Sequence, residues 1–165
     1  YEAALCAFRK ISLRQTPSAA FRCRISRPDN TWSMTESASG STLSVTLIPP
    51  EPAAARFVLT MFAVPPGYPA KTILDGRINT LAGILGPLEI VESSQVKIAG
   101  KTAARVLYRV RDPKQGSAPA PPISENCLFV DGANGYLFKL AFPEGSEEGV
   151  RPAFDAILSS FELVP

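Results

Sequence analysis

Several stretches of the chain alternate apolar and polar residues, which is the pattern of a strand with one buried face. The clearest are 21–27 (FRCRISR), 42–48 (TLSVTLI) and 102–111 (TAARVLYRVR). Turn-forming residues follow the first two, with Pro-Asp-Asn at 28–30 and Pro-Pro at 49–50. Four further strands are expected from shorter or less regular patterns, at 32–35, 88–98, 125–131 and 136–142. The sequence Gly-Ala-Asn-Gly at 132–135 predicts that the last two form a hairpin.

Three other segments have a different periodicity. Residues 56–64 (RFVLTMFAV) are apolar at consecutive positions, so we expect a central strand covered on both faces. Residues 73–85 carry a leucine and isoleucine stripe at steps of three and four, which predicts an amphipathic helix ended by Gly86-Pro87. A second helix is expected from a similar stripe that runs from Val150 to Phe161.

The order of these elements is β-β-β-β-α-β-β-β-β-α, so strands do not alternate with helices as they do in a doubly wound parallel fold. The pattern predicts an α+β domain, mainly an antiparallel β-sheet with two main helices packed on it, over residues 20–165. Residues 1–19 form a separate lead-in, where an apolar stripe at Tyr1, Leu5 and Phe8 favours a short helix. The Pro-rich stretch 112–122 is expected to be an extended excursion.

Five segments taken together resemble the PsbP-like group, which includes the DcrB-like bacterial envelope proteins. They are FRCRISRPDNTW at 21–32, TILDGRINTLAGIL at 72–85, VKIAGKTAARVLYRV at 96–110, LFVDGANGYLFKLAFP at 128–143 and FDAILSSFEL at 154–163. The resemblance implies a PsbP-like α/β/α sandwich. It also implies an accessory or binding module rather than an enzyme, because members of this group share a fold and not a chemistry.

Composition narrows the chemistry further. The 165 residues include no histidine, which removes the usual general base, the usual zinc ligand and every Ser-His or Cys-His pair. We therefore expect no catalytic residues, no metal site and no cofactor. The longest mostly apolar run, 57–66, is far shorter than the roughly 20 residues of a membrane-spanning helix.

The cysteines are Cys6, Cys23 and Cys127. One disulfide among them is possible in three alternative pairings. Cys23 and Cys127 fall in strand-like segments, where a small buried apolar side chain is the commoner role. Arg22 and Arg24 flank Cys23 in sequence, but side chains alternate in a strand, so both point to the face opposite the thiol. We therefore interpret Cys23 as a core residue.

Basic residues are concentrated near the start of the chain, although the whole chain has a net charge of only +2. A solvated sheet face would explain them. They could instead mark a surface for anionic lipid or an acidic protein. The candidate interaction surface is Arg22, Arg24, Arg105, Arg109, Arg111 and Trp32. These residues form one continuous surface only if the strand at 102–111 lies next to the strand at 21–27 in the sheet. Trp32 lies near a turn, where it would either cap the core or join a binding surface. Nucleic acid is disfavoured because no stacking aromatics interleave with the arginines.

The leading hypothesis is a non-enzymatic domain of an exported or envelope-associated bacterial protein that binds an unidentified protein partner. The partner would contact one sheet face or the 112–122 stretch. Periplasmic or extracellular placement is expected, with peripheral membrane association as an option and a cytoplasmic site not ruled out by the sequence. An alternative is a small-molecule or lipid carrier that uses a cleft between helix 73–85 and the sheet. A third is an enzyme built on carboxylates and arginines without histidine.

Overall fold

A computed structural model describes residues 5–7, 23–51, 54–111 and 123–164. The strands are β1 (Leu5–Ala7), β2 (Cys23–Ser26), β3 (Ser33–Ser39), β4 (Thr42–Ile48), β5 (Arg56–Ala63), β6 (Leu88–Ile98), β7 (Lys101–Val110), β8 (Ile123–Asp131), β9 (Asn134–Phe142) and β10 (Glu162–Leu163). The helices are α1 (Ala70–Leu85) and α2 (Glu147–Ser160). Every strand and helix predicted from periodicity in residues 21–163 is present, so the α+β prediction is confirmed.

The main sheet has seven antiparallel strands in the order β3-β4-β5-β9-β8-β7-β6. It consists of two meanders, β3-β4-β5 and β6-β7-β8, which β9 joins by pairing with β5 on one side and β8 on the other. Strands β1, β2 and β10 form a separate three-stranded sheet. β9 is therefore the middle strand of the main sheet, although it comes late in the sequence.

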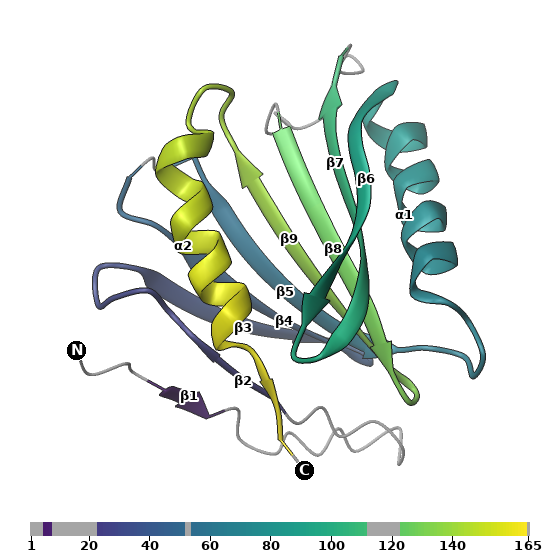
Figure 1. Ribbon diagram of the computed structural model, residues 1–165, viewed down its shortest axis with the longest axis horizontal. Helices are drawn as coiled ribbons and strands as arrows, with labels where there is room; N and C mark the ends of the chain where they lie inside the picture. Colours follow the sequence, from purple (N-terminus) through teal and green to yellow (C-terminus); the bar gives the residue numbers. More distant parts are fainter. Residues whose placement is uncertain (1–4, 8–22, 52–53, 112–122, 165) are drawn as a thin grey trace.

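One helix lies on each face of the main sheet. Alternate residues of β8 and β9 belong to two different cores, because successive side chains of a strand point to opposite faces. Phe129 and Phe138 pack with Phe154 and Ile157 of α2, whereas Leu128 packs with residues of α1. In Figure 1, α2 lies in front of β5 and β9, while α1 lies near β6 and β7. The layers are those of an α/β/α sandwich.

The α2 side holds the larger core. It contains a group of aromatic rings in which Phe161 meets Phe129, Tyr136 and Phe138 at centroid distances of 5.0–5.9 Å. Such edge contacts are favourable beyond the area they bury. The small sheet completes this core with Cys23 and Ile25 of β2. The prediction that Cys23 is a core residue is confirmed.

The α1 side holds a smaller core, built around Leu74 and Ile78 of the helix. Phe62 is held between two neighbours. The guanidinium carbon of Arg77 lies 4.3 Å from the ring centroid. A Cβ placed on Gly135 would lie 2.7 Å from the ring atoms, so only glycine fits beneath Phe62 on β9.

Three local predictions differ from the structure. Strand β5 is not covered on both faces, since Val58 and Thr60 on its α1 side are only half-buried. β8 is buried on both faces along most of its length, and so is β9 apart from Asn134 and Lys139. Helix α1 begins at Ala70, three residues before the predicted start. In the lead-in, Leu5–Ala7 form a strand paired with β2 rather than a helical turn, and the other residues of 1–19 lie outside the described residues.

Candidate binding surfaces

The hairpin of β6 and β7 carries side chains for two distinct surfaces, one on each face of the sheet. On β7, Val106 and Tyr108 point to the α1 side and join its core. Arg105 and Arg109 occupy the alternate positions, so their side chains point to the α2 side. β6 is the edge strand, which leaves its outer side unpaired by any described strand.

On the α2 side, five alternating charges form what we call the Glu125 cluster: Glu92, Arg105, Glu125, Arg151 and Glu147. Glu125 of β8 is only 2% exposed. Arg105 donates two hydrogen bonds to its carboxylate, Nε to Oε1 at 2.7 Å and Nη2 to Oε2 at 3.2 Å. Arg151 of α2 also donates to Glu125 Oε2. The two arginines then extend outward, Arg105 to Glu92 at 3.0 Å and Arg151 to Glu147 at 2.8 Å.

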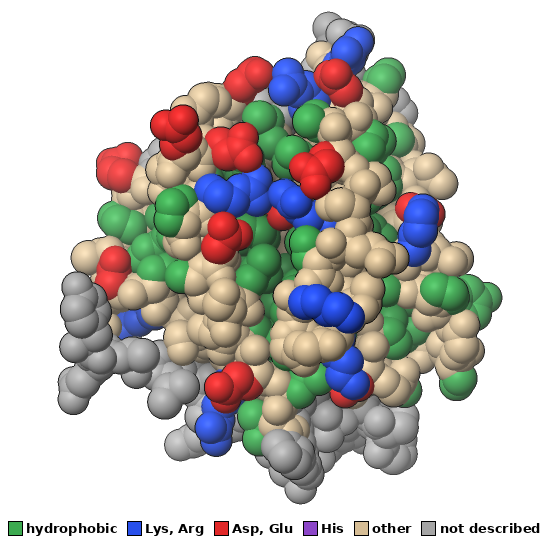
Figure 2. Space-filling view, viewed as in Figure 1, with side chains coloured by type: hydrophobic (Ala, Val, Ile, Leu, Met, Phe, Trp, Pro, Cys, Tyr) green, Lys and Arg blue, Asp and Glu red, His purple; other side chains and the backbone are tan. Residues whose placement is uncertain are grey.

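The cluster is satisfied internally, which decides what it can do. A buried carboxylate is tolerated when it is paired and hydrogen-bonded. The hydrogen bonds from Arg105 to Glu125 raise the pKa of the Arg105 guanidinium. The cluster thus has neither a free carboxylate nor a free guanidinium for a substrate, and it fastens the first turns of α2 to β7 and β8. Figure 2 shows basic side chains at the centre of this face with acidic side chains around them.

A second group of ion pairs lies closer to the sheet edge. Glu89 of β6 accepts from Arg111 at 2.9 Å and lies 3.8 Å from Arg109, which in turn donates to Glu144 at 3.1 Å. The hydrogen bond from Arg111 lowers the pKa of the Glu89 carboxyl. About one-third or more of each of these four side chains is exposed to solvent. Ion pairs this exposed contribute little to stability.

The structure separates the members of the candidate interaction surface predicted from the sequence. Arg105, Arg109 and Arg111 are brought together on one face, where they are paired with carboxylates. Arg24 is exposed on β2, which belongs to the small sheet and does not neighbour β7, so the two groups do not form one continuous arginine stripe. Arg22 lies outside the described residues.

Trp32 is 8% exposed and belongs to the larger core. Of the two roles open to it from the sequence, the structure supports capping of the core. Its carbonyl accepts a hydrogen bond from Arg27 at 3.2 Å, which fixes the turn between β2 and β3.

The sequence prediction overlooked Glu125 and Arg151. Their partners are 20 and 26 residues distant along the chain, beyond the reach of local patterns. A usable signal was present: Glu125 shares strand parity with Cys127 and Phe129, which both point into the core. A carboxylate at a core position requires a cation opposite it.

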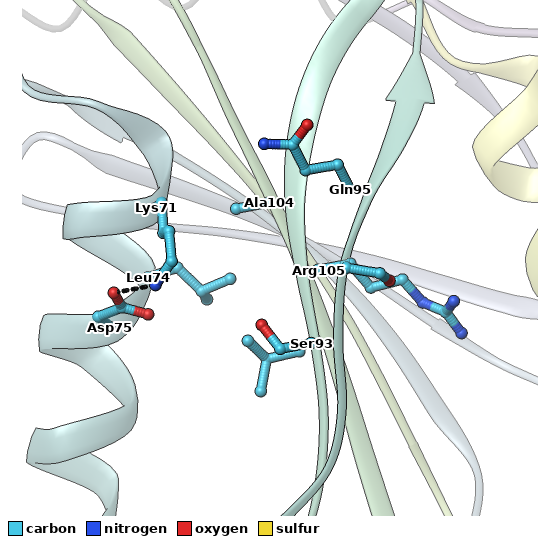
Figure 3. Close-up of a pocket in the computed structure, with 9 residues that line it drawn as sticks. Lys71, Leu74, Asp75, Ser93, Gln95, Ala104 and Arg105 are labelled. Carbon is cyan, nitrogen blue, oxygen red and sulfur yellow. Dashed lines mark hydrogen bonds and ion pairs between the residues drawn. The ribbon is translucent and has the colours of Figure 1, made fainter.

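A pocket of about 220 Å³ lies between α1 and the β6–β7 hairpin. Its apolar floor is Leu74, Ala104 and Val106, and its polar walls are Lys71, Asp75, Ser93, Ser94 and Gln95. Figure 3 shows the Lys71–Asp75 ion pair on the helix side and the Arg105 side chain pointing away from α1. The pocket occurs where the carrier hypothesis placed it. It is small, its lining is polar and apolar in similar proportion, and Leu74 and Ile78 beside it are packed against the sheet.

Exposed large apolar side chains are concentrated at the junction of α1 and β6. The described residues have four of them, Tyr68, Ile84, Ile90 and Val91, and three fall between residues 84 and 91. Ile90 and Val91 are 47% and 48% exposed and lie at a β-bulge of the edge strand. Ile90 is in register with Tyr108 and so faces the α1 side, whereas Glu89 and its ion pairs lie on the opposite face of the sheet.

No group of three or more Cys, Asp or Glu residues among the described residues could hold a metal ion. Cys23 and Cys127 are buried free thiols, and burial raises the pKa of Cys23 to about 12. Burial likewise raises the pKa of Cys127, so neither thiol ionises near neutral pH. No helix in the described part of the chain is long and apolar enough to cross a membrane.

The sequence matches no family model and no curated protein. Solved structures are similar in fold. Cyanobacterial PsbP from Synechocystis aligns with a TM-score of 0.62 at 16% identity, over 86% of each chain. A Pseudomonas aeruginosa protein of unknown function, described as a candidate regulator, aligns at 0.56 and 14% identity over 86% of this chain and 90% of its own.

A Bacteroides thetaiotaomicron protein aligns at 0.55 and 14% identity over 87% of this chain but only 45% of its own. No DcrB-like protein is among these three structures, so that part of the resemblance stays a prediction. Superposition over 86% of both chains at a TM-score of 0.62, between sequences that are only 16% identical, identifies the architecture: the protein has a PsbP-like fold.

Proposed function

We propose that the protein is a non-catalytic accessory domain that binds a protein partner at the junction of α1 and β6. The observation that carries the proposal is the concentration of exposed apolar side chains at that junction, with Ile90 and Val91 on a sheet edge that no described strand pairs with. Sheet edges are usually protected by charge, proline or covering elements, and exposed apolar residues on an edge are typical of interaction sites.

The opposite edge of the sheet provides an internal comparison. Strand β3 reads SMTESAS, and its exposed positions are polar or alanine. It has none of the large exposed apolar residues found in the described chain. The two edges thus differ in their exposed large apolar side chains, which β6 has and β3 lacks. This difference favours β6 as the edge that a partner covers.

The non-catalytic part of the proposal is supported by the absence of histidine from the sequence and by the pairing of every charge in the Glu125 cluster. The proposed setting is an exported or envelope-associated bacterial protein, on the basis of the fold resemblance. Cell fractionation of the full-length gene product tests that setting, and recovery in the cytosol alone would contradict it.

Site-specific photocrosslinking in the native host tests the binding surface. A photoreactive residue at Val91 is expected to give a discrete protein adduct. The same residue at Tyr68, which is 54% exposed but precedes α1 at its other end, should not. Ile90→Glu should abolish the adduct at Val91 while the circular dichroism spectrum is unchanged. Equal crosslinking at both positions, or no adduct at Val91, would refute the proposal.

The pocket beside α1 supports a second candidate function, binding of a small polar ligand. Its volume is below the roughly 300–1,000 Å³ of typical ligand sites, and its polar walls do not suit an acyl chain. A lipid carrier is therefore disfavoured relative to a carrier of small polar molecules. Ala104→Leu fills the floor of the pocket, so any ligand-induced rise in melting temperature seen with the wild type should disappear in that variant.

A further inference from the structure

The α1-side face of the main sheet is only half covered. Helix α1 contacts β7 and β8, which lie at one end of the sheet. At one end of β5 and β9 the helix also covers Phe62 and Leu137. Over β3, β4 and the rest of β5 and β9, around Val58 and Lys139, no described helix or strand lies on this side, because α2 and the small sheet pack on the other face. We call this uncovered half the open face.

The open face has no acidic side chain. Register pairing places one residue of each strand in line across the sheet, and these rows can be read directly. Its residues on β3 and β4 are Ser33, Thr35, Ser37, Ser39, Thr42, Ser44, Thr46 and Ile48. Those on β5 and β9 are Arg56, Val58, Thr60, Phe62, Gly135, Leu137, Lys139 and Ala141. All charges on these strands at this face are therefore positive.

Lys139 is at the centre of this arrangement. It lies on the middle strand, opposite Val58 of β5 and Asn126 of β8. The side chain is half-buried, and desolvation lowers its pKa. None of the carboxylates in the described residues lies within ion-pair distance of it. A partly buried cation without a counterion is unfavourable, and most folds supply the counterion themselves.

The neighbour of Lys139 on β8 is Asn126, which has the shape of an aspartate but no charge to neutralise the lysine. Asn126 is 2% exposed, and its side-chain oxygen has no hydrogen-bond partner in the described structure. Aspartate at this position would place a carboxylate in the same row as Lys139. The chain instead leaves an unpaired acceptor beside an unpaired cation.

Two more cations flank Lys139 along the same strands. Arg56 is exposed, two residues before Val58 on β5, which puts it diagonally across from Lys139 at roughly 7–8 Å between Cα atoms. Arg77 reaches over Phe62, four residues beyond Val58, and burial lowers its pKa. Neither has an ion-pair partner in the described residues. From Arg56 to Phe62 the strand extends about 20 Å, at roughly 3.3 Å per residue.

This geometry selects among anionic ligands. A single small oxyanion cannot contact cations spread over about 20 Å. A planar membrane surface would meet α1, which projects from the same face over β7 and β8, before it reached Lys139. Single-stranded nucleic acid would need exposed aromatic rings for stacking, and Phe62 is buried beneath Arg77. An extended acidic chain could span the spread of the three cations, lie on the sheet beside α1 and complement the positive charge of the face.

We propose that the open face binds an extended acidic segment of a partner protein, with its carboxylates on Arg56, Lys139 and Arg77. Hydroxyl groups of β4 and β5 lie on the same face: Ser44 donates to Thr60 at 3.4 Å, and the Thr60 hydroxyl is available to donate to the ligand. This inference shares one premise with the proposed function, namely that the ligand is part of a protein partner. It uses a different surface from the β6 edge, so the two can fail separately.

The probe is a fluorescein-labelled peptide of about eight residues with Glu at every second position, because alternate side chains of an extended chain share a face. Fluorescence anisotropy at low salt should show saturable binding to the protein and none for the matched peptide with Gln in place of Glu. Lys139→Met keeps the aliphatic stem and should weaken binding roughly tenfold, as expected for loss of a charged hydrogen bond.

Two variants separate this site from general electrostatic attraction. Asn126→Asp removes no cation and supplies Lys139 with an internal counterion, so it should weaken binding as much as Lys139→Met. Lys97→Met is the matched control: Lys97 is on the same face of the sheet at the far side of α1, is exposed and pairs only with Thr102. Its effect should stay below about twofold.

Equal weakening by Lys97→Met and Lys139→Met, or unchanged binding in Asn126→Asp, would overturn the inference. Absence of wild-type binding to the Glu peptide would also overturn it. If the Val91 crosslink nevertheless forms in that case, the proposed function stands and only the acidic segment is excluded. Melting curves of each variant confirm that the fold is intact.

Discussion

Replacement of Glu125 by Gln tests whether the Glu125 cluster holds α2 on the sheet. The substitution keeps the size of the side chain and one acceptor oxygen but removes the charge that two arginines share. Loss of one partner of a buried ion pair usually costs about 3–5 kcal/mol. Arg105 and Arg151 are each about one-fifth exposed and keep Glu92 and Glu147, so the lower end, about 3 kcal/mol, is expected.

Equilibrium urea unfolding measures this cost directly. Trp32 is the only tryptophan and is buried, so its fluorescence reports unfolding of the larger core. A loss of about 3 kcal/mol corresponds to a melting temperature lower by roughly 6–12 °C for a domain of this length. The control is Glu147→Gln at the exposed end of the same cluster, which should cost less than about 0.5 kcal/mol.

The reasoning is refuted if the Glu125 and Glu147 variants have the same unfolding free energy. It is supported further by a double-mutant cycle. Arg151→Met should cost less in the Glu125→Gln background than in the wild type, because its main partner has already lost its charge.

Three other expectations concern separate parts of the fold. Gly135→Ala should destabilise the protein by about 1–3 kcal/mol in the same urea assay, because the added methyl group collides with Phe62; an unchanged midpoint would mean that the ring moves freely. Thiol reagents at pH 8 should leave Cys23 and Cys127 unmodified until urea is added, and rapid labelling of the native protein would contradict their burial. Lys139→Met should stabilise the protein at neutral pH. The folded-state pKa of Lys139 lies below its unfolded value, so the wild type gains stability as the pH rises through the interval between the two pKa values. The difference in unfolding free energy between the variant and the wild type should therefore shrink toward pH 10. A difference that does not change with pH would argue against desolvation of Lys139.

The strands could be located from the sequence because their two faces differ in environment. The alternation at 42–48 corresponds to residues that are buried on the α2 side and half-exposed on the open face. β5 was misjudged for a related reason: its apolar residues on both faces suggested two covering layers, whereas the open face leaves Val58 partly exposed. Apolar content alone does not distinguish a covered face from a face that a partner could cover.

The binding surfaces were harder to predict because they depend on which strands become neighbours. The arginines of β7 were recognised as sharing one face, but their carboxylate partners come from β6, β8 and the loop before α2. Whether Arg24 joins them depends on the division into two sheets, which strand periodicity does not encode. Lys139 looks like an ordinary outward residue of a hairpin until β9 is known to be the middle strand.

The central place of β9 has a consequence for how the protein is made. A growing chain contains β3, β4 and β5 well before residues 134–142 leave the ribosome, and until then β5 presents an unpaired apolar edge. The pairing of Phe57 with Leu140 closes a loop of more than half the chain, a slow and entropically costly step. Nascent chains that stop short of β9 should therefore be the aggregation-prone species, and holdase chaperones should bind them in preference to the finished domain.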